Sequence, residues 1–232
     1  MKIIVGNWKM NGNIKSKETM LRALKNLKTN NKIILCLPFT LLGGNNHNIT
    51  IGAQDISQHP NGPYTGDISG KMIYENGAKY VIVGHSERRI YHHETNEIVK
   101  QKAIASIKNK LIPIICVGEN WSDKKSGKTV SIIKKMLMES IPETGKYIIA
   151  YEPTWAIGTG KTPTPRDISI AVETILKTLN NIKHNNIKIL YGGSVNAKNT
   201  MEILSVAHVD GLLVGGASLK VKTFLPIINS VK

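Results

Sequence analysis

The chain has 232 residues, of which 41% are hydrophobic, so it is long enough to bury one large core. Its 31 basic and 16 acidic residues give a net charge of +15, which raises nucleic acid as a possible partner. The lysines are spread over all the predicted helices, however, and aromatic residues make up only 5%, so we expect no nucleic-acid ligand. No apolar run is long enough to span a bilayer or to act as a secretion signal, so we expect a cytoplasmic protein without a membrane partner.

Eight short apolar segments recur along the chain, and each ends in polar or glycine-rich residues. They are rich in Ile, Val and Leu without alternation, which is typical of parallel strands covered on both faces. We predict strands at 2–6, 32–37, 49–53, 79–84, 112–118, 146–151, 187–191 and 209–214. Cys36 and Cys116 lie inside two of these strands, which favours buried, reduced thiols over a disulfide or a metal site.

Segments with helical periodicity lie between most of these strands. Ser16 is placed to cap the first helix. Ser69 is placed to cap a short helix that ends at Gly77. Thr164 is placed to cap a helix that has Pro165 in its first turn. Further helices are predicted at about 94–109 and 129–141, after Asn196 and after Ala217. Only residues 38–48 separate the second and third strands, so we expect the helix there to be vestigial or absent.

Alternating strands and helices imply right-handed crossovers, and closure of the sheet would remove both of its edges. We therefore predict an α/β fold of the (β/α)8 TIM-barrel type, with residues 1–232 forming a single domain. An open, doubly wound sheet stays as the alternative, because the sequence does not reveal the order of the strands.

In such a barrel, functional groups lie at the carboxyl ends of the strands. Asn7, Trp8 and Lys9 follow the first predicted strand, His85 follows the fourth, and Glu152 follows the sixth. A carboxylate, an imidazole and an ammonium group at one mouth fit proton abstraction next to a carbonyl, with donors for the oxyanion. Taken singly, Lys9 fits a solvated surface residue and His85 a structural one.

The last two strands end in glycine pairs that lead towards helix starts. These are Gly192 with Gly193, followed by Ser194, and Gly215 with Gly216. Each pair alone fits a tight turn, but together they predict an anion site of backbone N–H groups.

The loop after Glu152 is bounded by Pro153 and Pro163 and contains Gly158 and Gly160, which favours a segment that closes over a ligand.

Two polar clusters have simpler interpretations. The run of Glu87, Arg88 and Arg89 is interpreted as a structural ion-pair set, in which Glu87 also contacts Lys9. His92, His93 and Glu94 look like metal ligands, but they lie at a helix start expected to be exposed and lack a second cluster, so we expect no metal.

Seven motifs resemble the triosephosphate isomerase family and follow its order along essentially the whole chain. They lie at 6–11 (GNWKMN), 64–69 (YTGDIS), 84–89 (GHSERR), 116–119 (CVGE), 150–160 (AYEPTWAIGTG), 191–195 (YGGSV) and 210–219 (DGLLVGGASL). The chain is shorter than most of the family, with residues missing after the second strand and before the sixth.

The resemblance implies interconversion of dihydroxyacetone phosphate and glyceraldehyde 3-phosphate in glycolysis and gluconeogenesis, without cofactor or metal. It assigns proton transfer to Glu152, carbonyl polarisation to neutral His85, and charge near the oxyanion to Lys9, which Asn7 positions. Trp8 belongs to the same binding motif. The resemblance assigns phosphate binding to N–H groups at Gly158, Ser194, Gly215 and Gly216.

The resemblance also implies a homodimer. In the family, the loop of Tyr64, Thr65 and Gly66 enters the neighbouring subunit near that subunit's Asn7 and Lys9.

Two other functions remain open from the residues themselves. One is a different phosphate-binding isomerase or aldolase that uses a Schiff-base lysine, for which Lys9 is the obvious candidate. The other is a basic nucleic-acid-binding barrel, which would bind DNA or RNA with a steep salt dependence.

Overall fold

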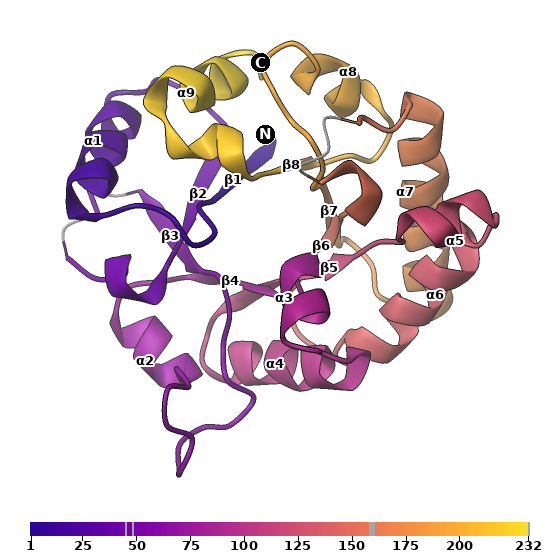
Figure 1. Cartoon of the computed structure of the whole chain (residues 1–232), viewed down its shortest axis with the longest axis horizontal. Helices are drawn as coiled ribbons and strands as arrows, with labels where there is room; N and C mark the ends of the chain where they lie inside the picture. Colours follow the sequence, from indigo (N-terminus) through magenta and orange to yellow (C-terminus); the bar gives the residue numbers. More distant parts are fainter. Residues whose placement is uncertain (45, 48, 158–160, 232) are drawn as a thin grey trace.

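The computed structural model describes residues 1–44, 46–47, 49–157 and 161–231. Within them, eight parallel strands pair in chain order and close into a barrel, with helices around the outside (Figure 1). The strands are β1 Ile3–Asn7, β2 Lys32–Leu37, β3 Thr50–Ala53, β4 Tyr80–Val83, β5 Ile112–Val117, β6 Ile148–Tyr151, β7 Lys188–Tyr191 and β8 Gly211–Val214. The barrel prediction is confirmed, and the doubly wound alternative is wrong because β1 pairs with β8.

Closure depends on a close backbone approach between the first and last strands. Ile3 pairs with Gly211 and donates its N–H to the carbonyl of Asp210 at 3.0 Å. A side chain at Gly211 would place its Cβ 1.8 Å from the Ile3 carbonyl oxygen. Only glycine therefore allows the two strands to meet in this register.

The strands are apolar on both faces because they separate two core layers. Val5, Cys36 and Cys116 belong to the cluster inside the barrel, whereas Ile4 and Leu35 belong to the larger cluster between strands and helices. Both cysteines are buried and free, as predicted. The continuous Ile/Val/Leu pattern reflects this burial on both sides.

The helices follow the strands in the expected order. They are α1 Ile14–Lys25, α2 Gly70–Glu75, α3 Ser86–Tyr91, α4 Asn96–Lys108, α5 Trp121–Lys125, α6 Thr129–Ser140, α7 Pro165–Asn181, α8 Thr200–Ser205 and α9 Val221–Asn229, with 3-10 turns η1 Phe39–Leu41, η2 Thr154–Ala156 and η3 Gly216–Leu219. None of the helices in the described residues is both long and apolar enough to cross a membrane.

Two of the predicted helix caps are wrong. Asn13, not Ser16, caps α1, because Ser16 is the third helical residue and completes the capping box with Asn13. Asn199, not Asn196, is the N-cap of α8; the Asn196 side chain instead accepts the N–H groups of Lys198 and Asn199 in the preceding turn. Ser69 and Thr164 cap their helices as predicted.

The sector between β2 and β3 contains only the turn η1 among its described residues, so the expectation of a missing helix is confirmed. The Lys17 ammonium group, buried on α1, donates to the carbonyl of Gly43 at 2.5 Å, while the N–H of Gly43 donates to Asn76 at 3.0 Å. Burial lowers the pKa of Lys17. Hydrogen bonds from the flanking helices thus hold the shortened loop in place.

Candidate active site

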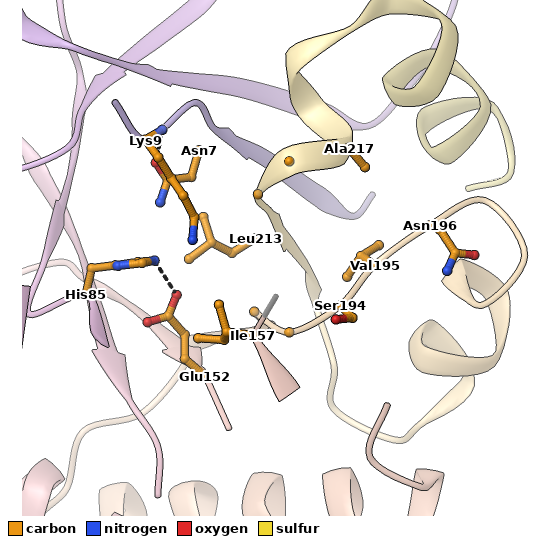
Figure 2. Close-up of a pocket in the computed structure, with 14 residues that line it drawn as sticks. Asn7, Lys9, His85, Glu152, Ile157, Ser194, Val195, Asn196, Leu213 and Ala217 are labelled. Carbon is orange, nitrogen blue, oxygen red and sulfur yellow. Dashed lines mark hydrogen bonds and ion pairs between the residues drawn. The ribbon is translucent and has the colours of Figure 1, made fainter. Parts of the chain in front are cut away.

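A cavity of about 390 Å³ opens at the carboxyl ends of the strands. Its walls bring together Asn7 and Lys9 from the end of β1, His85 from β4, Glu152 from β6, and the glycine pairs after β7 and β8. Figure 2 shows Lys9, His85 and Glu152 converging on one side of it, with Ser194 and Ala217 on the other. The barrel therefore gathers side chains that are far apart in the sequence.

Glu152 lies directly after β6, and its N–H donates to the carbonyl of Val117 at 2.8 Å. It is only 3% exposed, and its Oε1 lies 3.2 Å from Nε2 of His85, while the N–H of Ser86 donates to Oε2 at 3.2 Å. Burial alone would raise the pKa of Glu152. His85, the Ser86 N–H and the Cys116 thiol outweigh it and lower the pKa below its usual value. The carboxylate is therefore ionised at neutral pH.

His85 is the N-cap residue of α3. Its Nδ1 accepts the N–H of Glu87 at 3.2 Å, so in the neutral ring the proton lies on Nε2 and faces Glu152. Burial opposes the charged form of His85, but the Glu152 carboxylate raises the pKa of the imidazole overall. A second proton on Nδ1 would displace the Glu87 N–H, which opposes protonation, whereas the Glu87 carboxylate 3.6 Å from Nδ1 favours it.

Lys9 has a left-handed backbone, with φ of 51°, which is uncommon for a residue other than glycine. Its N–H donates to Oδ1 of the buried Asn7 at 3.0 Å, which stabilises this turn. Its ammonium group forms an ion pair with the Glu87 carboxylate, as the sequence predicted. Asn7 thus positions the backbone of Lys9, and Glu87 positions its side chain.

Trp8 does not line the cavity, which corrects its prediction as a substrate-binding residue. Its indole is 1% exposed and packs in the outer core layer, where a Cβ on Gly12 would lie 2.6 Å from it. The neighbouring residues Asn7 and Lys9 face the cavity, and the residue between them points the opposite way.

The glycine pairs also line the cavity, and one of them lies close to Lys9: a Cβ on Gly215 would lie 3.4 Å from Cε of Lys9. A Cβ on Gly192 would lie 2.9 Å from Cγ of Glu152, whereas a Cβ on Gly216 would meet nothing within 4 Å. The Ser194 hydroxyl donates to the carbonyl of Ala156 at 2.7 Å, which joins the loop after β7 to the turn after β6. Gly158, predicted to bind phosphate, lies outside the described residues.

The family profile described as triosephosphate isomerase matches residues 2–231, almost the whole chain.

The chain belongs to the triosephosphate isomerase family.

Curated members of this family align with nearly the full length of the chain. The triosephosphate isomerase of Albidiferax ferrireducens is 42% identical, with 99% of this chain and 98% of that protein covered. That of Mycoplasma mobile is 43% identical, with 98% and 99% covered. The crystal structure of triosephosphate isomerase from Bartonella henselae superposes with a TM-score of 0.88 at 38% identity, covering 99% of this chain and 98% of that one.

Some residues that line or support the cavity were not predicted from the sequence. Ile157, Val195 and Leu213 form apolar walls, and nothing in their residue type distinguishes them from core residues. Ser86, whose N–H holds Glu152, could have been found because it follows His85 at a helix start, where N–H groups lack helical partners.

The cluster around Glu94 is structural in this triosephosphate isomerase fold. Glu94 is only 6% exposed, so the prediction of an exposed helix start is wrong there. Its Oε1 lies 2.5 Å from both Lys102 Nζ and Arg88 Nε, and Asp55 pairs with the same two cations. Among the described residues, no three His, Cys, Asp or Glu side chains are grouped as metal ligands.

Proposed function

We propose that this chain interconverts dihydroxyacetone phosphate and D-glyceraldehyde 3-phosphate through an enediolate, with Glu152 as the base and His85 as the electrophile. The observation that carries the proposal is the contact of 3.2 Å between Oε1 of Glu152 and Nε2 of His85 inside the cavity. A buried base beside a hydrogen-bond donor suits proton abstraction from a carbon next to a carbonyl.

The Glu152 carboxylate removes a proton from the carbon next to the carbonyl. The electron pair of the broken C–H bond forms the carbon–carbon double bond, and the carbonyl electrons move to oxygen. The Nε2–H of His85 stabilises that oxyanion and exchanges protons between the two enediolate oxygens. The carboxylic acid of Glu152 then returns the proton to the adjacent carbon, so no cofactor or metal is consumed or required.

Lys9 adds positive charge near the developing oxyanion, and Asn7 fixes the turn that presents it. The phosphate group binds to N–H groups of Ser194, Gly215 and Gly216, which line the cavity, and the family resemblance adds the N–H group of Gly158. This arrangement lets the anionic group anchor the substrate while its other end reacts.

A Schiff-base mechanism at Lys9 is disfavoured by the contacts of its ammonium group. The ion pair with Glu87 stabilises the charged form of Lys9, whereas a nucleophilic amine must be neutral. Borohydride treatment in the presence of glyceraldehyde 3-phosphate should therefore leave the mass of the protein unchanged.

We also propose that residues 1–232 form one domain and that the protein is a cytoplasmic homodimer. The dimer proposal rests on the loop of Tyr64, Thr65 and Gly66. Tyr64 is 41% exposed and stacks on His59, with ring centroids 3.8 Å apart. Met10, which follows Lys9, is 96% exposed and would be covered by the partner subunit in the proposed dimer.

The function is tested by a coupled assay that follows conversion of glyceraldehyde 3-phosphate to dihydroxyacetone phosphate. Glu152→Asp withdraws the carboxylate by one methylene group and should lower kcat by about 100-fold or more without loss of folded protein. The control is Glu173→Asp on the exposed face of α7, which should keep normal activity. Near-normal turnover by Glu152→Asp would remove Glu152 from the mechanism, and inactive wild-type protein would refute the function.

A further inference from the structure

The short helix α5 contacts the segment that follows β6. Two of its residues, Trp121 and Lys124, lie three positions apart and so face the same side of the helix. Trp121 is 45% exposed, which is unusual for so large an apolar side chain outside an interface. Its position is explained by what its ring touches.

The segment between β6 and α7 has two flanks that α5 contacts: the turn η2 at its start and the residues from Lys161 onward at its end. On the first flank, Trp121 packs against Trp155 in η2. Their ring centroids are 5.5 Å apart with the planes inclined at 52°, a favourable tilted arrangement. The Trp155 indole N–H donates to Oε1 of the buried Glu119 at 3.1 Å, and the Lys124 ammonium lies 5.8 Å from the centre of the Trp155 ring. Trp155 is therefore held by three groups from the β5–α6 connection.

On the other flank, the same helix contacts residues before and within α7. The Lys161 ammonium lies 4.7 Å from the centre of the Trp121 ring, a cation–π distance. Lys124 forms an ion pair with Asp167, which also accepts the N–H of Thr164 in the capping box of α7. The side chain of Trp121 thus touches both flanks, at Trp155 and at Lys161.

The first flank forms part of the cavity wall. Ile157 lies two residues beyond Trp155 and lines the cavity, and the carbonyl of Ala156 accepts the Ser194 hydroxyl. A shift of Trp155 would move both contacts, because η2 is a single turn.

We propose that Trp121 is a positioning residue for ligand binding: its ring holds Trp155 and Lys161, and so fixes Ile157 in the cavity wall and the Ala156 carbonyl that accepts the Ser194 hydroxyl. Trp121 touches neither Glu152 nor His85 in this arrangement, so its effect falls on binding of the phosphate group and not on proton transfer. The inference rests on the proposed function for its substrate, but it is also testable with inorganic phosphate alone.

The test compares Trp121→Ala with Trp121→Phe, which keeps an aromatic ring. Without the Trp121 ring, Trp155 and Lys161 sample more positions. They must then be ordered when ligand binds, and this cost weakens binding. Trp121→Ala should raise both the KM for glyceraldehyde 3-phosphate and the calorimetric Kd for inorganic phosphate about 3- to 10-fold, with kcat within about twofold of wild type. Trp121→Phe should recover most of the loss in both measurements.

Met138→Ala is the matched control, because Met138 is 49% exposed on α6, and it should change neither constant. Unchanged KM and phosphate affinity in Trp121→Ala would overturn the inference. So would a fall in kcat without a change in KM, or failure of Trp121→Phe to recover binding. If wild type binds phosphate but does not isomerise the substrate, the proposed function fails while the phosphate measurements still decide the role of Trp121.

Discussion

Glu152 and Glu94 are both buried carboxylates, but their neighbours suit them to different tasks. Glu152 contacts an imidazole, a backbone N–H and a thiol, and it faces the cavity. Glu94 contacts an ammonium and a guanidinium group inside the protein. Protonation of Glu94 would leave the buried Lys102 and the partly buried Arg88 with less compensation, whereas protonation of Glu152 is a step of the reaction we propose.

The Glu94 cluster predicts a pH-dependent stability. Burial alone would raise the pKa of Glu94. The charges and hydrogen bonds of Lys102 and Arg88 outweigh burial, so the net pKa lies below the usual value of 4.5. Its folded-state pKa is depressed, so its contribution to stability is present above pH 4.5 and is lost as the pH falls through the folded-state pKa. Glu94→Gln should therefore reduce the free energy of unfolding at pH 7 by about 3 kcal/mol, and by less below pH 4.5.

Urea unfolding of wild type and Glu94→Gln between neutral and acidic pH measures this difference. Asp55 remains in both proteins, but its pKa is raised by burial and also by the charge of Glu94, so the difference between the two proteins reports on the Glu94–Asp55 cluster as a whole. Glu97→Gln, on the same helix α4, is the control and should stay within about 0.5 kcal/mol of wild type at every pH. A difference in the free energy of unfolding between wild type and Glu94→Gln that stays constant across the pH range would contradict the stabilising role of ionised Glu94.

The sequence predicted which polar residues gather at the mouth better than it predicted where each side chain points. Asn7, Lys9, His85 and Glu152 all line the cavity, because strand ends in a closed barrel meet at one rim. Trp8 follows the same strand but packs in the core, since the direction of a side chain depends on local backbone dihedrals. The left-handed backbone of Lys9 could not be predicted either, because lysine has no preference for a positive φ.

At the scale of elements, the start of α7 should be sensitive to its cap. The Thr164 hydroxyl accepts the N–H of Asp167 at 3.2 Å, and the Asp167 carboxylate accepts the N–H of Thr164 at 3.1 Å. Thr164→Ala removes one of these acceptors and should cost about 1 kcal/mol in the free energy of unfolding, whereas Thr164→Ser should cost less. Thermal or urea unfolding measures both.

Thr19→Ala provides the comparison for the cap. Thr19 lies inside α1, where its hydroxyl donates to the carbonyl of Lys15 and serves no orphan N–H group. Alanine is a better helix former, so this change should be neutral or slightly stabilising. Equal losses at Thr19 and Thr164 would show that the capping box contributes nothing specific.

The strands and most of the helices were predictable from the sequence, but the short helices α3 and α5 were not. The strands were evident because burial on both faces makes them continuously apolar, and α7 because its apolar positions repeat over 17 residues. Helices α3 and α5 contain only six and five residues, fewer than two turns, so they carry no helical periodicity. Both matter for the site, since α3 holds His85 and Glu152, and α5 contacts Trp155.

At the scale of the molecule, the proposed homodimer is tested by sedimentation. Wild type should sediment as a dimer, and Thr65→Arg, which adds a long charged side chain to the loop of Tyr64, Thr65 and Gly66, should sediment as a monomer with reduced kcat. The loss of activity is expected because the partner's loop would support Asn7 and Lys9. Thr144→Arg, in an exposed loop after α6, should leave both properties unchanged. A monomeric wild type with full activity would sink the proposal.

The pairing of β1 with β8 also bears on the order of events during translation. The first strand is synthesised long before its second neighbour, which consists of residues Gly211–Val214. Until they emerge, the nascent chain carries an open apolar strand edge of the kind that chaperones shield from aggregation. The barrel therefore cannot close until residues 211–214 have been made.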